Sequence, residues 1–229
     1  MDGYGELALA TASFVGGHLI LSHPLRAPLV KALGAIGFQI LYAVAAFASL
    51  WWISRAWKAA PGAAPLWAVG DGLWAFASVI MLIASVLLMG SLIGNPAFPA
   101  PNVKAPAQAR GVYAITRHPM LWSFALWGIA HMLVFPIPAQ FIVAGGFTAF
   151  ALIGAAALDA KKARLNPDLW RPWVAMTSYW PFQAIVQGRA RFGGFRPHDL
   201  AGGLVIWLGA TWAHQPAAGI AAGIWRWVG

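Results

Sequence analysis

Six histidines are the side chains of this sequence best suited to chemistry. The chain has no cysteine and only six acidic residues. Disulfides, thiolate nucleophiles and cysteine-bound metals are therefore excluded, and catalysis by paired carboxylates is disfavoured. Three of the histidines, His18, His131 and His214, lie within apolar segments, where an ionisable side chain is costly and marks a functional candidate. No His-x-x-x-His pair occurs, so the sequence gives no support to a zinc hydrolase site.

The elements that must position these histidines are membrane spans. Of 229 residues, 60% are hydrophobic and 9% are charged, and the mean hydropathy is +0.68. A soluble domain carries about 25% charged residues. This composition excludes a disordered chain and an ordinary nucleic-acid-binding domain, so we expect contact with membrane lipid and none with nucleic acid. We predict an all-α, polytopic transmembrane bundle that forms a single domain over residues 1–229.

Apolar stretches of about 20 residues predict six spans. Their expected ranges are 4–22, 34–53, 71–94, 119–135, 139–158 and 199 onward. Pro216 is expected to break the last span and leave a half-helix or a re-entrant segment up to Val228. Loop 159–198 mixes aromatic and basic residues, which predicts an amphipathic interfacial segment between spans five and six. Glycines predict close helix contacts at five positions, namely Gly90, Gly94, Gly145, Gly146 and Gly154.

The positive charge of the chain is a topology signal. With six spans, 12 Lys and Arg residues fall on one side of the membrane and three on the other. The side rich in Lys and Arg is expected to be cytoplasmic, which places both termini on the opposite side. The net charge of +9 therefore needs no polyanionic partner to explain it.

Two of the intramembrane histidines can meet near the middle of the bilayer. At about 1.5 Å per residue, His18 and His131 lie at depths that differ by roughly 8 Å, and His214 is the alternative partner of His131. Two facing imidazoles without cysteine or carboxylate partners suit a haem iron with histidine on both sides. The alternative is a neutral histidine that hydrogen-bonds a neighbouring helix. Three arginines near the cytoplasmic interface are candidates to pair with haem propionates: Arg26, Arg110 and Arg117.

The segment Thr116-Arg117-His118-Pro119 predicts the start of the fourth span, because proline suits the first helical position. Arg117, His118 and the free N–H groups of this helix start can bind an anionic group such as a carboxylate or phosphate. The alternative role of His118 is helix capping combined with anchoring at the membrane interface.

Several of these residues carry a family resemblance. They are Gly17-His18 followed by Ser22, Pro24, Leu25 and Arg26, then the block Arg110–His131 with Thr-Arg-His-Pro and Trp-x-x-x-His, Thr177-Ser178, Pro181-Phe182 and His214-x-Pro. Over nearly its whole length the chain resembles the NnrU family of bacterial membrane proteins. That family is associated with nitrite and nitric oxide respiration, and the resemblance implies a location in the bacterial inner membrane. In that membrane, the termini expected opposite the cytoplasm are periplasmic.

A plant and cyanobacterial relative of this family, 15-cis-ζ-carotene isomerase, implies haem b as the cofactor. By motif, His131 matches the haem-ligating histidine of that relative, and His18 matches the other family histidine. The resemblance thus implies a haem b-binding protein with His18 and His131 as metal ligands, or a haem-dependent cis–trans isomerase of an apolar polyene. The relative has a cysteine where this chain has Gly128, which counts against the isomerase.

A second resemblance leaves a different class of function open. Arg117-His118-Pro119-Met120 is similar to an element of isoprenylcysteine carboxyl methyltransferases, which bind S-adenosylmethionine. Leu121 replaces the tyrosine of that element, and the only glutamate of the chain is Glu6; both differences count against methyl transfer. A non-enzymatic role in assembly or sensing also stays open, as does the number of subunits.

Overall fold

A computed structural model describes residues 3–98 and 106–228 and is all-helical in these ranges. Six helices are long: α1 Gly3–Ser22, α2 Arg26–Ala59, α3 Asp71–Ser91, α5 Pro119–Val134, α6 Pro138–Leu165 and α9 Pro197–Ala218. Four are short: α4 Val112–Ile115, α7 Pro167–Met176, α8 Gln183–Val186 and α10 Trp225–Val228. The predicted all-α class is confirmed.

The six long helices coincide with the six predicted spans. Helices α1, α2, α3 and α6 are long and apolar enough to cross a membrane, and α5 is a shorter apolar helix. Helix α2 is longer than the predicted span 34–53, because it begins at Arg26 and contains a kink at Gly34, where φ is +72°. Helix α6 also continues past the predicted end, to Leu165, so that its charged last turns extend beyond the apolar stretch.

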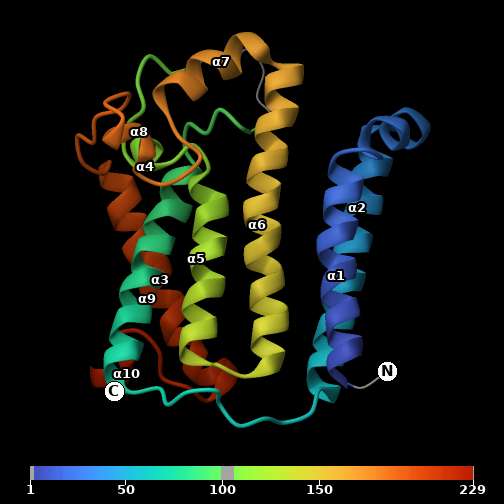
Figure 1. Cartoon of the computed structure of the whole chain (residues 1–229), viewed down its shortest axis with the longest axis vertical. Coiled ribbons are helices and arrows are strands. Elements are labelled where there is room, and N and C mark those ends of the chain that lie inside the picture. Colours follow the sequence, from blue (N-terminus) through green and yellow to red (C-terminus); the bar gives the residue numbers. More distant parts are fainter. Residues whose placement is uncertain (1–2, 99–105, 229) are drawn as a thin grey trace.

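Neighbouring helices follow the spatial order α9, α3, α5, α6, α1, α2 (Figure 1). Helix α6 therefore separates the hairpin α1–α2 from the group formed by α3, α5 and α9. The start of α1 and the short helix α10 lie at one end of the molecule, and α4, α7 and α8 lie at the other (Figure 1).

Glycines set the close approach of several helices. A Cβ at Gly203 of α9 would lie 2.7 Å from the Val86 Cα of α3, and one at Gly90 would lie 2.6 Å from the Val112 side chain. A Cβ at Gly146 of α6 would collide with Thr11 of α1. Close contacts are thus confirmed at Gly90 and Gly146, whereas the other three predicted positions lie in looser surroundings. These are Gly94, Gly145 and Gly154.

The predicted amphipathic segment between spans five and six is α7 with its following loop. Trp170 and Trp173 of α7 are each 1% exposed and pack against protein, in a core shared with Val112 of α4 and Val86 of α3. The apolar face of α7 therefore covers the end of the bundle. Of the later aromatic side chains in this segment, Trp180 and Phe182 are exposed.

Candidate functional site

A histidine pair lies inside the group formed by α3, α5 and α9. His131 comes from the last turns of α5 and His214 from the last turns of α9, and their ring centres are 6.0 Å apart. Both residues line a cavity of about 500 Å³, whose wall also includes Trp57 near the end of α2, Phe135 after α5 and Ile220 after α9. Known ligand pockets measure about 300–1,000 Å³, so this cavity has the size of a cofactor site.

The backbone determines which ring nitrogen of each histidine is available. His131 Nδ1 lies 2.7 Å from the Trp127 carbonyl oxygen, and His214 Nδ1 lies 2.8 Å from that of Ala210. A carbonyl oxygen only accepts hydrogen bonds, so each Nδ1 must carry the proton. In a neutral ring the lone pair is then on Nε2, which is the arrangement found in metal-binding histidines.

Most other polar groups around the cavity are already satisfied by their own helices. The hydroxyls of Ser78, Ser85 and Thr211 each donate to the carbonyl four residues earlier. The remaining wall is largely apolar: it includes the indoles of Trp57, Trp74 and Trp207 and several alanines. The histidine Nε2 atoms are therefore the principal metal-binding donors that this wall offers.

The chain after α9 folds back and closes one side of the cavity. Helix α9 runs through Pro216 to Ala218 and ends at Gly219, where φ is +70°. The predicted break thus falls three residues after Pro216, which occupies the last turn of the helix. Trp225 Nε1 donates to the Leu208 carbonyl of α9, and Ile220, Ala222 and Gly223 of the returning segment line the cavity.

A cation lies beside this cavity. The Arg226 guanidinium stacks 4.8 Å from the ring centre of Trp74, a wall residue, and pairs with Asp71 at 3.1 Å. The sequence does not predict where Arg226 lies, because an isolated arginine after the last long helix can contact any of several helices.

His18 lies elsewhere, and the structure does not bring it together with His131. The His18 ring packs against Phe14, Tyr42 and Phe150, in a separate small cavity of about 50 Å³ between α1 and α2. Helix α6 stands between this position and the cavity of His131. The depth estimate allows either partner for His131, and the helix order places His214, not His18, beside it.

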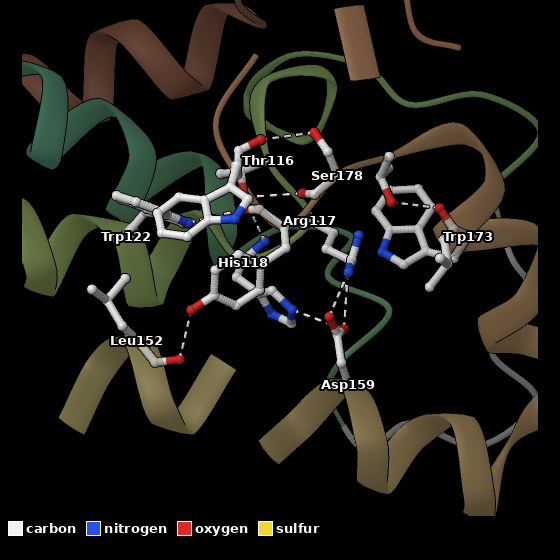
Figure 2. A network of polar contacts seen from close by, with 12 residues as sticks. Thr116, Arg117, His118, Trp122, Leu152, Asp159, Trp173 and Ser178 are labelled. Atoms are coloured by element: carbon white, nitrogen blue, oxygen red, sulfur yellow. Dashed lines mark hydrogen bonds and ion pairs between the residues drawn. The ribbon is translucent and has the colours of Figure 1, made fainter. Parts of the chain in front are cut away.

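A second polar cluster is located at the opposite end of α5 and contains the predicted anion-binding residues (Figure 2). Arg117 Nε and Nη2 donate to the Asp159 carboxylate of α6, with the shortest N–O distance 2.5 Å, and His118 Nε2 lies 2.9 Å from it. The predicted anionic group is thus a carboxylate of the chain itself. His118 makes no side-chain capping bond, although Pro119 occupies the first turn of α5 as expected.

The loop after α7 holds this cluster in place. Arg117 N donates to the Ser178 carbonyl at 2.9 Å, and Thr116 Oγ1 donates to the Tyr179 carbonyl at 2.8 Å (Figure 2). The Tyr179 hydroxyl donates to Leu152 of α6, and burial, followed by the nearby Asp159 charge, raises the pKa of Tyr179. Sequence reasoning missed Asp159, because a charged residue at the end of a span usually marks only the membrane interface.

None of the arginines proposed to pair with propionates lines the histidine cavity. Arg117 binds Asp159, and Arg26 lines a different cavity between the α1–α2 turn and α6. His118 and His131 are 13 residues apart on α5, which corresponds to about 20 Å along the helix axis. His198 Nε2 lies 3.0 Å from an oxygen of the fully buried Asp199 carboxylate.

Comparison with models of protein families assigns the chain to a family. The model of the family described as NnrU protein matches residues 6–222. The chain belongs to the NnrU family. No curated protein and no solved structure matches the chain. In this NnrU protein, the Thr116–Pro119 block and the Thr177–Phe182 segment, which are far apart in the sequence, pack against each other at the Asp159 cluster.

Proposed function

We propose that this NnrU-family protein is a haem b-binding protein of the bacterial inner membrane, with His131 and His214 as the iron ligands. The observation that carries the proposal is the imidazole pair, 6.0 Å between ring centres, in a largely apolar cavity of about 500 Å³. The basic end with α7 and α8 would face the cytoplasm, and the end with the termini would face the periplasm.

The cavity wall offers two metal-binding nitrogens, His131 Nε2 and His214 Nε2, which suits a metal that arrives already bound within a cofactor. In residues 3–98 and 106–228, no three histidine or acidic side chains come together to hold a metal ion. Two imidazoles alone are a poor site for a bare ion, but they would suffice as the protein ligands of a haem iron. His131 and His214, whose ring centres are 6.0 Å apart, are the residues that would hold it.

The residues around the cavity have distinct tasks in this proposal. Bound haem would supply a redox-active iron. The Trp127 and Ala210 carbonyls hold the two imidazoles in the Nε2-donor form. Trp57, Trp74 and Trp207 provide apolar walls. Arg226, which stacks on Trp74 and pairs with the exposed Asp71, would have to exchange that carboxylate for a propionate. A role in nitrite or nitric oxide respiration belongs to this proposal through the family association.

Absorption spectroscopy of detergent-purified protein from haem-replete cells tests the proposal. We expect a Soret band that shifts on reduction with dithionite and that is lost in His131→Ala and in His214→Ala. His18→Ala is the matched control, because His18 also bonds its own helix but lies outside the cavity. A colourless wild-type preparation would refute haem binding, and loss of the band only in His18→Ala would refute this ligand pair.

Haem-dependent isomerisation of a linear polyene is the second candidate, favoured by the apolar wall of the cavity. The structure gives a reason for the absence of the relative's cysteine. A Cβ at Gly128 would collide with the Thr148 hydroxyl of α6 and lie 2.7 Å from the Ala144 carbonyl oxygen. A side chain there would force α5 and α6 apart instead of entering the cavity. Chromatography of a tri-cis ζ-carotene after incubation with reduced protein separates the two candidates.

Methyl transfer receives less support from the geometry. Arg117 and His118, which carry the resemblance to methyltransferases, both bind Asp159 instead of lining a cavity. The Glu6 carboxylate accepts a hydrogen bond from Trp52 Nε1 at the other end of the bundle. Calorimetric titration with S-adenosylmethionine tests this function, and we expect no binding heat.

A further inference from the structure

A cavity of about 220 Å³ lies at the basic end of the bundle, away from the histidine pair. It is lined by Ser22, Arg26, Phe38, Gln39, Tyr42 and Lys161. The cations come from different helices: Arg26 begins α2, and Lys161 lies in the last turns of α6. The chain therefore brings two positive charges to one cavity from positions more than a hundred residues apart.

These two cations have no acidic partner among the described residues. Lys161 Nζ donates only to the Ser22 carbonyl at 3.2 Å, and the Arg26 guanidinium lies 5.7 Å from the centre of the Phe38 ring. Arg117, in contrast, is neutralised by Asp159 on the same end of the molecule. The charge of the Arg26–Lys161 cavity is thus left available for an external anion.

Neutral hydrogen-bond donors complete the cavity. Ser22 Oγ donates to the Tyr42 hydroxyl oxygen at 3.2 Å, which leaves the phenolic proton of Tyr42 free to donate into the cavity. The Gln39 amide lies on the same wall. A guanidinium, an ammonium, a phenol and an amide together match an anion with several acceptor oxygens, as in a phosphate group.

The position of the cavity indicates which molecule presents the phosphate. Its cations lie where α1 ends, α2 begins and α6 ends, which is the level of lipid headgroups for spans of this length. Two exposed isoleucines come two residues before lining residues of the cavity: Ile20, 49% exposed, precedes Ser22, and Ile36, 74% exposed, precedes Phe38. They offer an apolar surface for acyl chains. Basic cavities between spans on the cytoplasmic side are known binding places for anionic lipid headgroups.

We propose that the cavity between the α1–α2 turn and α6 is a binding site for the phosphate group of an anionic phospholipid. Arg26 and Lys161 bind the phosphate oxygens, Tyr42 donates a further hydrogen bond, and the exposed isoleucines contact the acyl chains. This site is independent of the histidine cavity and of haem.

Native mass spectrometry of the full-length protein in detergent tests the site. Phosphatidylglycerol is titrated against wild type, Arg26→Gln/Lys161→Gln and the control Arg55→Gln/Lys58→Gln, which removes the same charge from exposed positions at the other end of α2. Removing two headgroup-level cations is expected to weaken binding by at least about tenfold, whereas the control is expected to change it less than about twofold. Tyr42→Phe, which leaves the charge and the ring intact, is expected to weaken binding by a smaller factor.

Three results would overturn the proposal. Equal losses in the test and control variants would mean that the lipid responds only to total charge. Equally tight binding of zwitterionic phosphatidylcholine would remove the role of the two cations. Displacement of the lipid by an equal concentration of inorganic phosphate would show that free phosphate is the ligand. Tryptophan fluorescence melting of each variant verifies the fold, and Arg26→Lys, which retains the charge, is expected to bind lipid normally.

Discussion

Asp159 is predicted to be the residue that ties α6 to the start of α5. Its carboxylate accepts hydrogen bonds from the Nε and Nη2 atoms of Arg117 and from His118 Nε2. The side chains of Arg117, His118 and Asp159 are 12%, 1% and 20% exposed. Asp159→Ala therefore leaves a mostly buried guanidinium and a buried imidazole without their acceptor, while the exposed fraction lets water compensate in part.

The expected magnitude follows from this burial. Removing one partner of a buried pair costs about 3–5 kcal/mol, and the partial exposure places Asp159→Ala near the lower limit, at about 3 kcal/mol. For a chain of this size that corresponds to a fall in Tm of about 6–12 °C. The 14 tryptophans permit a label-free fluorescence melt in detergent, which is useful because the chain has no cysteine for thiol dyes.

Matched variants make the result specific. Asp159→Asn keeps an acceptor oxygen, so its Tm is expected to fall less than that of Asp159→Ala. Asp168→Ala removes an exposed carboxylate from nearby α7 and is expected to change Tm little. Arg117→Ala should lower the Tm of the Asp159→Ala protein much less than it lowers the Tm of wild type, because the ion pair is already broken. If Asp159→Ala melts at the temperature of Asp168→Ala, the reasoning about this cluster is wrong.

Two further outcomes are expected in the bundle and at the α1–α2 turn. Gly203→Ala should destabilise the protein by about 1–3 kcal/mol, because its Cβ would meet the Val86 backbone. Gly209→Ala on the same helix adds a Cβ in open space and should leave Tm unchanged in a thermal melt. Equal changes of Tm in the two variants would contradict the packing of α9 on α3. Burial, followed by the Lys161 charge, lowers the pKa of His23 in the folded state. The stabilisation by neutral His23 should therefore be complete above pH about 6.5 and be lost as pH falls below it. Ring NMR titration of His23 should show this low pKa and a rise toward the ordinary value in Lys161→Met; a normal wild-type pKa would contradict it.

Residue patterns predicted the six long helices well, because long apolar stretches favour helices, and four of these helices are long and apolar enough to cross a membrane. The same patterns determine how deep a histidine lies along its helix but not which helix it faces. That choice depends on close approaches such as Gly203 against Val86 and Gly128 against Thr148, which place α9 and α6 on different sides of the α3–α5 pair. His214 therefore faces His131, although the resemblance favoured His18.

The predicted amphipathic segment shows a different limit. Its mix of aromatic and basic residues predicted an amphipathic segment at the membrane interface, but the pattern is the same whether the apolar side meets lipid or protein. Trp170 and Trp173 meet the core formed with Val112 of α4, a helix of four residues that no periodicity could indicate. The role of Asp159 could not be predicted either, since its partners Arg117 and His118 are about 40 residues away in the sequence.

Electron paramagnetic resonance of the oxidised, purified protein tests the central assignment most directly. With His131 and His214 as axial ligands, wild type and His18→Ala should give the same low-spin ferric signal, whereas His214→Ala should give a high-spin signal or no haem signal. A His214→Ala protein that retains the wild-type low-spin signal would contradict the account, as would its loss in His18→Ala alone.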